Sequence, residues 1–283
     1  MYDLLFVKRR RRRKIAALVA LFSSFGVSSL VIISFLGRSV GTFTVALNNS
    51  EVKLALLEKE HSTNYSTYLR VTSNSNYVES TFEDLRYKLN KLDDETTPSD
   101  DGEKDQTYVD TNGKTVKGKC LEYFKYTFYV KNIGSKTAAY SLKINIDDRT
   151  RADDNTGRSL DDTLRVMVFE NKPDSDKHDY RVFAKKAAAN NIDINGVATE
   201  RELISRRDLT SNQETEECRL AEMFADGGTI AEYTTYGFIK NDMTRYTIVV
   251  WLEGTDPQSD YDKKLPKGAT LKLGVDITAH ENE

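Results

Sequence analysis

The sequence predicts an all-β protein: an antiparallel β-sandwich with one or two short helices, preceded by a single transmembrane helix. Apolar residues alternate with polar ones in about ten short segments, which is the period of half-buried strands. No fixed-period repeat accompanies them, so propellers and solenoids are disfavoured and two packed sheets are the natural arrangement. Near the amino terminus, 22 residues pass without a charge, which predicts the transmembrane helix.

The uncharged segment, residues 15–36, directly follows a basic run that contains five consecutive arginines. A helix rises about 1.5 Å per residue, so this segment reaches the ~30 Å thickness of a bilayer's hydrocarbon core. Because loops rich in lysine and arginine stay in the cytoplasm, residues 1–14 are expected to be a basic cytoplasmic head. Residues 15–36 then form a signal-anchor helix in the lipid bilayer, and residues 37–283 an extracytoplasmic domain.

A cleaved signal peptide is the alternative. The basic beginning fits one, but the apolar run is longer than the usual ~7–15 residues, and no clear Ala-x-Ala site follows it. Retention of the helix is therefore the favoured interpretation. Cleavage near residues 37–46 remains open.

The net charge changes from positive to negative after the uncharged segment. The first 40 residues hold eight of the 41 lysines and arginines but one of the 44 acids, so residues 41–283 carry a net charge of −10. An acidic surface disfavours nucleic acid as a partner, since phosphates require positive charge. Beside a membrane helix, the arginine run is better explained by topology and anionic lipids.

The first strands are expected close to the membrane. Alternating apolar residues at 42–47 and 52–56, with an Asn-Asn-Ser turn between them, predict a strand pair that leaves almost no linker after the helix. Within residues 62–92, only 68–71 has the character of a strand, and the rest is expected to be irregular. Residues 93–105 form an acidic loop, and Asn112-Gly113 predicts a hairpin turn.

The clearest pattern lies at residues 124–146. Two alternating segments flank a turn that contains Asn132 and Gly134, which predicts an antiparallel hairpin with one core face and one wet face. A second acidic loop is expected at residues 147–163. Strands at 164–168 and 180–183 follow.

The last third of the chain mixes helix and strand signals. Two capping-box patterns, at 199–202 and 211–214, and a helical spacing at 220–224 predict one or two short helices within residues 185–228. Three strands then end the domain, at 230–239, 246–252 and 271–277. The middle one is apolar on both faces and should be central, with Trp251 in the core.

Two stretches are similar to a known family. Residues 124–146 contain F-Y-V-K-N-I-G-S-K-T-A-A-Y-S-L-K-I, and residues 245–257 read R-Y-T-I-V-V-W-L-E-G-T-D-P. Together they resemble the TasA/camelysin-like group of exported bacterial surface and biofilm-fibre proteins, as does G-T-F-T at 41–44. The resemblance implies a jelly-roll-like β-sandwich and a role at the cell surface. The long apolar segment and the acidic insertions depart from that group.

Few residues point to a chemical site. Asp153, Asn155 and Asp161 offer the oxygen ligands that calcium takes, although their spacing does not match an EF-hand, and a solvated acidic surface is the favoured interpretation. Cys120 and Cys218 either form one disulfide or stay unpaired, because sequence does not reveal their distance. No cofactor is predicted, and the three histidines lack the spacing of a zinc site.

The expected function is that of a single-pass, membrane-anchored cell-surface protein of bacteria, an interaction or structural module rather than an enzyme. Its partner would be an extracellular protein, an envelope component or another copy of the chain. The alternative is a cleaved, secreted subunit of surface or biofilm-matrix fibres. A membrane-anchored enzyme whose site forms only in three dimensions is a third hypothesis, which no catalytic motif supports.

Overall fold

The computed structural model of the chain describes residues 41–49, 52–73, 76–77, 79–93, 103–109, 115–151, 158–172, 179–187, 191–192, 198–205, 220–256 and 269–281. The cytoplasmic head and the transmembrane helix lie outside these residues and stay predictions. Of the helices that are described, none has the length and apolar character needed to cross a bilayer. The described part is mostly strands arranged in sheets, so the all-β prediction is confirmed.

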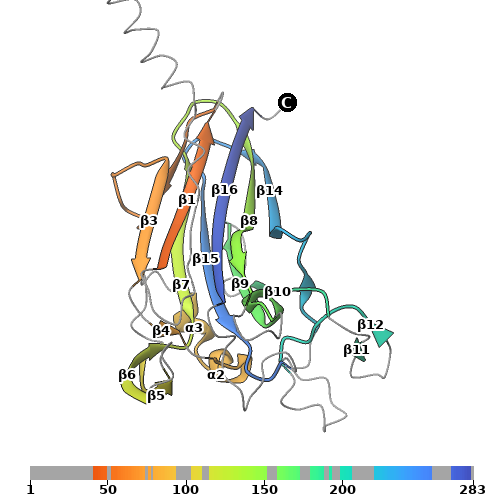
Figure 1. The fold of residues 1–283 in the computed structure, drawn as a ribbon. Helices are drawn as coiled ribbons and strands as arrows, with labels where there is room; N and C mark the ends of the chain where they lie inside the picture. Colours follow the sequence, from red (N-terminus) through yellow and green to blue (C-terminus); the bar gives the residue numbers. More distant parts are fainter. Residues whose placement is uncertain are drawn as a thin grey trace, which may run out of the picture.

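Two sheets form the body of the described part of the chain (Figure 1). The first has the order β14 (Thr229–Phe238), β8 (Ala138–Thr150), β16 (Thr270–Glu281), β1 (Gly41–Asn49) and β3 (Tyr68–Ser73). The second has the order β13 (Glu222–Met223), β10 (Tyr180–Ala184), β9 (Leu164–Asn171), β15 (Met243–Leu252), β7 (Phe124–Asn132) and β2 (Leu54–Leu57). The pairs β1–β16 and β10–β13 are parallel, so the expectation of purely antiparallel sheets is wrong.

Smaller elements gather at the end of the sheets where β15 finishes (Figure 1). They are β4 (Asn76–Tyr77), α2 (Phe82–Arg86), α3 (Leu89–Leu92), β5 (Glu103–Val109), β6 (Thr115–Leu121), the 3₁₀ turn η2 (Leu160–Asp162), β11 (Asn191–Ile192) and β12 (Ala198–Thr199). Strands β5 and β6 pair antiparallel on either side of Asn112-Gly113. The predicted hairpin is therefore present, and its turn lies outside the described residues.

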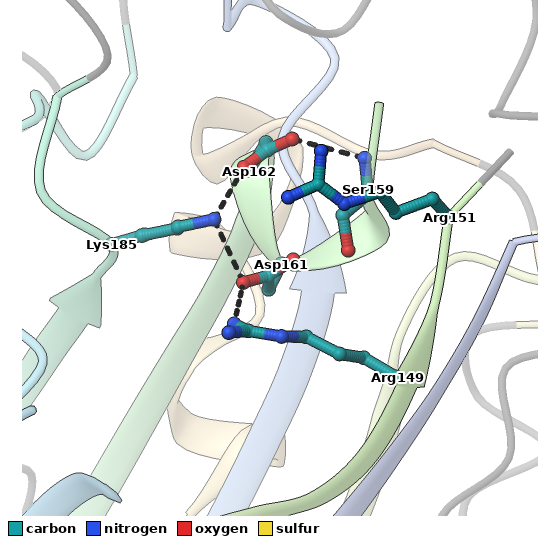
Figure 2. Close-up of a pocket in the computed structure, with 6 residues that line it drawn as sticks. All are labelled: Arg149, Arg151, Ser159, Asp161, Asp162 and Lys185. Atoms are coloured by element: carbon teal, nitrogen blue, oxygen red, sulfur yellow. Dashed lines mark hydrogen bonds and ion pairs between the residues drawn. The ribbon is translucent and has the colours of Figure 1, made fainter. Parts of the chain in front are cut away.

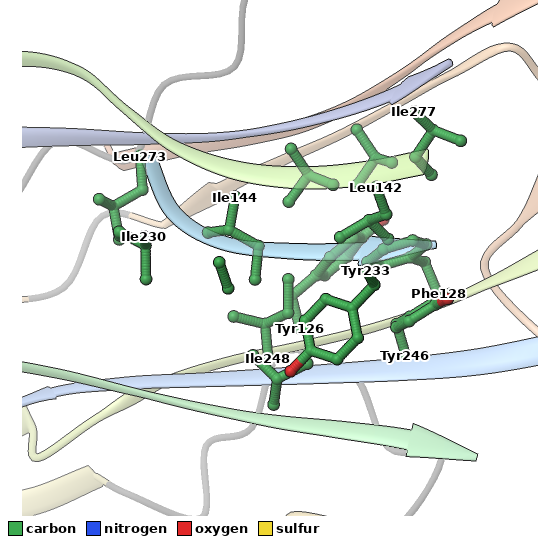
Figure 3. Packing of buried hydrophobic residues seen from close by; sticks show 14 of the residues in the cluster. Tyr126, Phe128, Leu142, Ile144, Ile230, Tyr233, Tyr246, Ile248, Leu273 and Ile277 are labelled. Carbon is green, nitrogen blue, oxygen red and sulfur yellow. The ribbon is translucent and has the colours of Figure 1, made fainter. Parts of the chain in front are cut away.

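One hydrophobic core is shared by the inner faces of the two sheets (Figure 3). Alternate residues of β8 and β16 meet alternate residues of β7 and β15, which is the packing that a period of two produces. Fully burying one such large apolar side chain stabilises the fold by about 1.5–3 kcal/mol. The contributors include Leu142, Ile144, Leu273 and Ile277 from the first sheet and Tyr126, Phe128, Tyr246 and Ile248 from the second.

The second sheet is buried on its other face as well. A separate cluster there packs Phe82 and Leu85 of α2 against Trp251 of β15, with the Phe82 and Trp251 rings stacked at 6.3 Å. Strand β15 lies between β9 and β7, in the interior of its sheet. The prediction that this strand is central and apolar on both faces, with its tryptophan in the core, is confirmed.

The segment at 124–146 forms two strands, but the predicted hairpin is wrong. Strand β7 belongs to the second sheet and β8 to the first, so the turn between them carries the chain from one sheet to the other. The wet face expected for β7 is also absent, because Lys125 and Thr127 are buried. Alternation reveals which residues share a face, but it leaves open which strand lies alongside.

The same error affects the first two strands. Strand β1 pairs with β3 and β16 in the first sheet, whereas β2 pairs with β7 in the second. The predicted strands are present and their pairing is not. The chain between them crosses from one layer to the other.

The helices lie where irregular structure was expected. Thr81 caps α2 by accepting the backbone N–H of Asp84, and Phe82 and Leu85 then face the core. In the region predicted to be helical, the described residues 198–205 and 220–228 form β12, β13 and bends instead. A capping pattern indicates the start of a helix only where an apolar stripe of helical period follows it. Residues Glu222–Met223, which were expected to be helical, form β13 and pair with β10.

The two acidic loops are shorter than predicted. Asp93 is 3% exposed and pairs with Arg245 at 2.8 Å, since the end of α3 places it over the second sheet. Residues 103–105 begin β5, and residues 147–150 continue β8. Arg151 and Ser159 form a β-bridge and residues 160–162 form η2, while residues 94–102 and 152–157 lie outside the described residues.

Candidate functional site

A polar cavity of about 220 Å³ lies where β8 ends, and it contains one of the predicted calcium ligands (Figure 2). Asp161, in η2, is fully buried there. Its Oδ2 accepts from Arg149 Nη1 at 2.6 Å and lies 2.9 Å from Lys185 Nζ. The other lining residues are Arg151, Ser159 and Asp162.

The charges in this cavity compensate one another. Burial by itself raises the pKa of Asp161, but hydrogen bonds and the positive charges of Lys185 and Arg149 outweigh it, so the pKa lies below its usual value. Burial lowers the pKa of Lys185, yet its bonds to Asp162 and Asp161 raise it overall. Asp161 and Lys185 therefore stay ionised near neutral pH, and the bonds of the cluster fasten η2 to the ends of β8 and β10.

The calcium hypothesis stays a prediction. Asp153 and Asn155 lie outside the described residues, and Asp161 has two cationic partners in place of a metal. Within the described part of the chain, no three acidic, histidine or cysteine side chains are arranged to hold a metal ion. The disulfide also stays a prediction, because the side chain of Cys120 and all of Cys218 lie outside the described residues.

The most elaborate polar arrangement surrounds Glu253, which is fully buried just after β15. Its Oε2 accepts from Trp251 Nε1 and from the backbone N–H of Phe82, each at 2.9 Å. Its Oε1 accepts from Thr255 Oγ1 at 2.6 Å, from Thr255 N at 3.2 Å and from Ser205 Oγ at 3.3 Å. One carboxylate thus joins the start of α2, the end of β15 and the segment around residue 205.

A buried ion pair lies beside it. Arg165 of β9 and Asp256 are both fully buried, and Nη2 donates to Oδ2 at 2.7 Å. The guanidinium also donates to the backbone oxygen of Leu203, from Nε at 3.2 Å and Nη2 at 2.9 Å. This charge in the interior is tolerable because it is paired and hydrogen-bonded.

Both arrangements fall in the Trp-Leu-Glu-Gly-Thr-Asp segment, residues 251–256. These bonds were not predicted from the sequence, although the motif itself was the available signal. The Asn-x-Gly turn has a similar role. Asn132 is fully buried, and its Nδ2 donates to the backbone oxygens of Phe238 at 2.7 Å and Lys136 at 2.9 Å. The most distinctive motifs of the chain therefore hold the fold together.

An acidic pair lies on the outer face of the first sheet. Asp147 of β8 lies against Gly274 of β16, where a Cβ atom would come within 2.6 Å of Asp147 Oδ2. Burial, and then the charge of Asp276, raise the pKa of Asp147 to about 6. A side chain at 274 would therefore force the Asp147 carboxyl group to move.

Replacing Asp147 by asparagine is expected to stabilise the protein at pH 8 and to have little effect at pH 4. The folded-state pKa exceeds the unfolded one, so the native state binds the proton more tightly and stability falls as pH rises from about 4 to about 6. A shift of two units corresponds to about 3 kcal/mol, and solvent screening of this half-exposed group reduces the gain to about 1–2 kcal/mol.

Urea unfolding of the full chain in detergent at both pH values measures this difference. Asp148→Asn is the matched control, because Asp148 is the exposed neighbour on the same strand. An equal gain for Asp147→Asn at pH 4 and pH 8 would contradict the assignment of the raised pKa.

The sequence matches no protein-family model and no curated protein, and no solved structure matches the fold. The similarity to the TasA/camelysin-like group therefore rests on residues 124–146 and 245–257 and stays a prediction. The structure adds a physical role for those residues, which is to fix turns and to satisfy buried charges.

Proposed function

We propose that this chain is a single-pass membrane protein that presents a β domain outside the cell as an interaction or structural module. The observation that carries the proposal is the position of β1. This strand begins at Gly41, four residues after the apolar segment, and it pairs with β16 on one side and β3 on the other. An interior strand of the core therefore continues almost directly from the anchor.

The position of β1 also bears on the alternative of a cleaved, secreted subunit. Val45 and Leu47 are buried in the shared core. Cleavage after residue 46 would remove six of the nine residues of an interior strand, so a processed form has to be cut before Gly41. The start of β1 is five residue steps from residue 36, and at no more than ~3.6 Å a step it lies within about 18 Å of the end of the apolar helix.

The strand order supports a jelly-roll-like sandwich for this domain. The four consecutive strands β14-β8-β16-β1 of one sheet lie over β10-β9-β15-β7 of the other. The chain changes sheet from β7 to β8, from β8 to β9, from β14 to β15 and from β15 to β16, which is the alternation that two nested Greek keys produce. The parallel pairing of β1 with β16 is a departure, because jelly rolls are antiparallel throughout.

The expected result is an intact amino terminus on the membrane-bound protein. Mass spectrometry of the protein purified from membranes should find peptides from residues 1–7, and alkaline carbonate should leave the protein in the pellet. Protease added to intact cells should remove the domain, since the arginine run holds the head in the cytoplasm.

A mature protein that starts between residues 37 and 41 and is found in the medium would reject the anchor and favour the secreted subunit. A domain protected from external protease would reject the orientation. A start beyond residue 46 would contradict the role of β1 in the core.

A further inference from the structure

Two isoleucines are exposed on neighbouring turns at one end of the described part, and Tyr236 is exposed near the end of β14, the strand that leads into one of these turns. Ile133 is 37% exposed, Ile239 57% and Tyr236 73%. Turns normally carry glycine, asparagine, aspartate or serine, so two exposed isoleucines at such positions are unusual. We refer to Ile133, Tyr236 and Ile239 as the isoleucine patch.

Buried hydrogen bonds around Asn132 hold this patch rigidly. The backbone N–H of Asn132 donates to the oxygen of Asp242 at 3.0 Å, and its oxygen accepts from the N–H of Asn241 at 2.8 Å. Its side-chain oxygen accepts from the N–H of Gly134 at 2.9 Å, and its amide donates to the oxygen of Phe238 at 2.7 Å. The turns at 132–137 and 239–242 are therefore fixed to each other. A surface already in its binding conformation loses little entropy on association.

The surroundings of the patch are positively charged. Lys53 and Lys240 are exposed, and the backbone oxygen of Lys53 accepts from the N–H groups of Ile133 and Gly134. The nearby carboxylate of Asp242 accepts from the N–H of Ile239 at 2.9 Å. An apolar centre with a charged rim is the composition of a protein-binding surface, and a lysine rim is complementary to carboxylates.

The patch lies at the end of the sheets remote from the start of β1. The register pairs Ala138 with both Phe238 and Glu281, so β14 and β16 finish beside the patch. Strand β1 runs parallel to β16 and therefore begins at the opposite end. If the anchor is retained, the patch is directed away from the lipid surface, and this orientation rests on the proposed function.

We infer that the isoleucine patch is a docking site for a protein segment in which a large apolar side chain is flanked by aspartate or glutamate. The apolar side chain contacts Ile133 and Ile239, and the carboxylates meet the lysine rim. Because three side chains are a small part of a standard interface of ~800 Å² per partner, the dissociation constant is expected in the micromolar range.

The test selects binders from a random dodecapeptide phage library against the full chain in detergent. Peptides with leucine, isoleucine or phenylalanine next to acidic residues are expected to be enriched. Their affinity for the double variant Ile133→Ser/Ile239→Ser should fall at least tenfold, and raising the salt concentration should weaken binding to the parent chain. Met223→Ser is the matched control, since Met223 is 42% exposed on β13, away from the patch.

Peptides that bind the double variant and the parent chain equally would overturn the inference, as would a selection without acidic and apolar enrichment. Self-association of the parent chain that the double variant abolishes would assign the patch to a second copy and would also overturn it. The fluorescence of the single tryptophan reports whether each variant is folded. Mass spectrometry of the amino terminus tests the membrane anchor, and peptide binding tests the isoleucine patch. A negative result for one proposal can therefore be told apart from a negative result for the other.

Discussion

Replacing Glu253 by alanine is expected to lower the free energy of unfolding by about 3–5 kcal/mol, which is a large part of the stability of a typical domain. The substitution leaves several donors without an acceptor, among them Trp251 Nε1 and the N–H of Phe82, which are buried. Each buried donor without a partner costs about 1–3 kcal/mol. Glu253→Gln should be intermediate, because one carboxylate oxygen becomes an N–H₂ group that faces other donors.

Urea unfolding followed by tryptophan fluorescence measures this effect directly, because Trp251 is the single tryptophan and donates to Glu253. Glu232→Ala is the control. Glu232 is 48% exposed and pairs with Lys143 at the surface, so its loss should cost less than about 1 kcal/mol. If the two variants unfold at the same urea concentration, Glu253 does not hold the fold together as described.

The second large effect is expected at the buried ion pair. Arg165→Met leaves the carboxylate of Asp256 in the interior without its cation, and Asp256→Leu leaves the guanidinium without its anion. Removing one member of a buried pair typically costs about 3–5 kcal/mol. The double variant Arg165→Met/Asp256→Leu should recover much of that loss, since neither charge then remains in the interior.

A double-mutant cycle on these variants measures the coupling free energy. The surface pair Arg181–Glu222, with both side chains at least 40% exposed, provides the matched cycle and should couple by less than about 1 kcal/mol. Additive losses at Arg165 and Asp256 would show that each residue acts through packing and that the pair does not act as a unit.

The sequence predicted the strands well because their signal is local. Burial on one face imposes a period of two, and β8, β14, β15 and β16 were all recognised from it. Pairing was mispredicted at β7–β8 and at β1–β2, because a short turn serves equally well between strands of one sheet and between strands of two. Nothing in the alternation of residues 124–146 distinguishes these cases.

The buried polar groups were harder to predict. Arg165 and Lys125 occupy positions that alternation assigns to a wet face, and both are buried, because α2, the segment at 203–205 and the motif at 251–256 cover the outer face of the second sheet. Such coverage comes from segments remote in sequence. Asp93 was assigned to a solvated loop for the same reason, since its partner Arg245 is 152 residues away.

The parallel pairing of β1 with β16 has a consequence for how this domain folds. The register joins Val45 to Val275, so the first described strand can pair early with β3 but finds its second neighbour, β16, only after almost all of the domain has been synthesised. Contacts of such long sequence separation give a high contact order, which slows folding. If the anchor holds the start of β1 at the membrane during export, the emerging chain stays open until β16 arrives and inserts between β1 and β8. Closure of the first sheet is then the last step of biogenesis and takes place on the outer side.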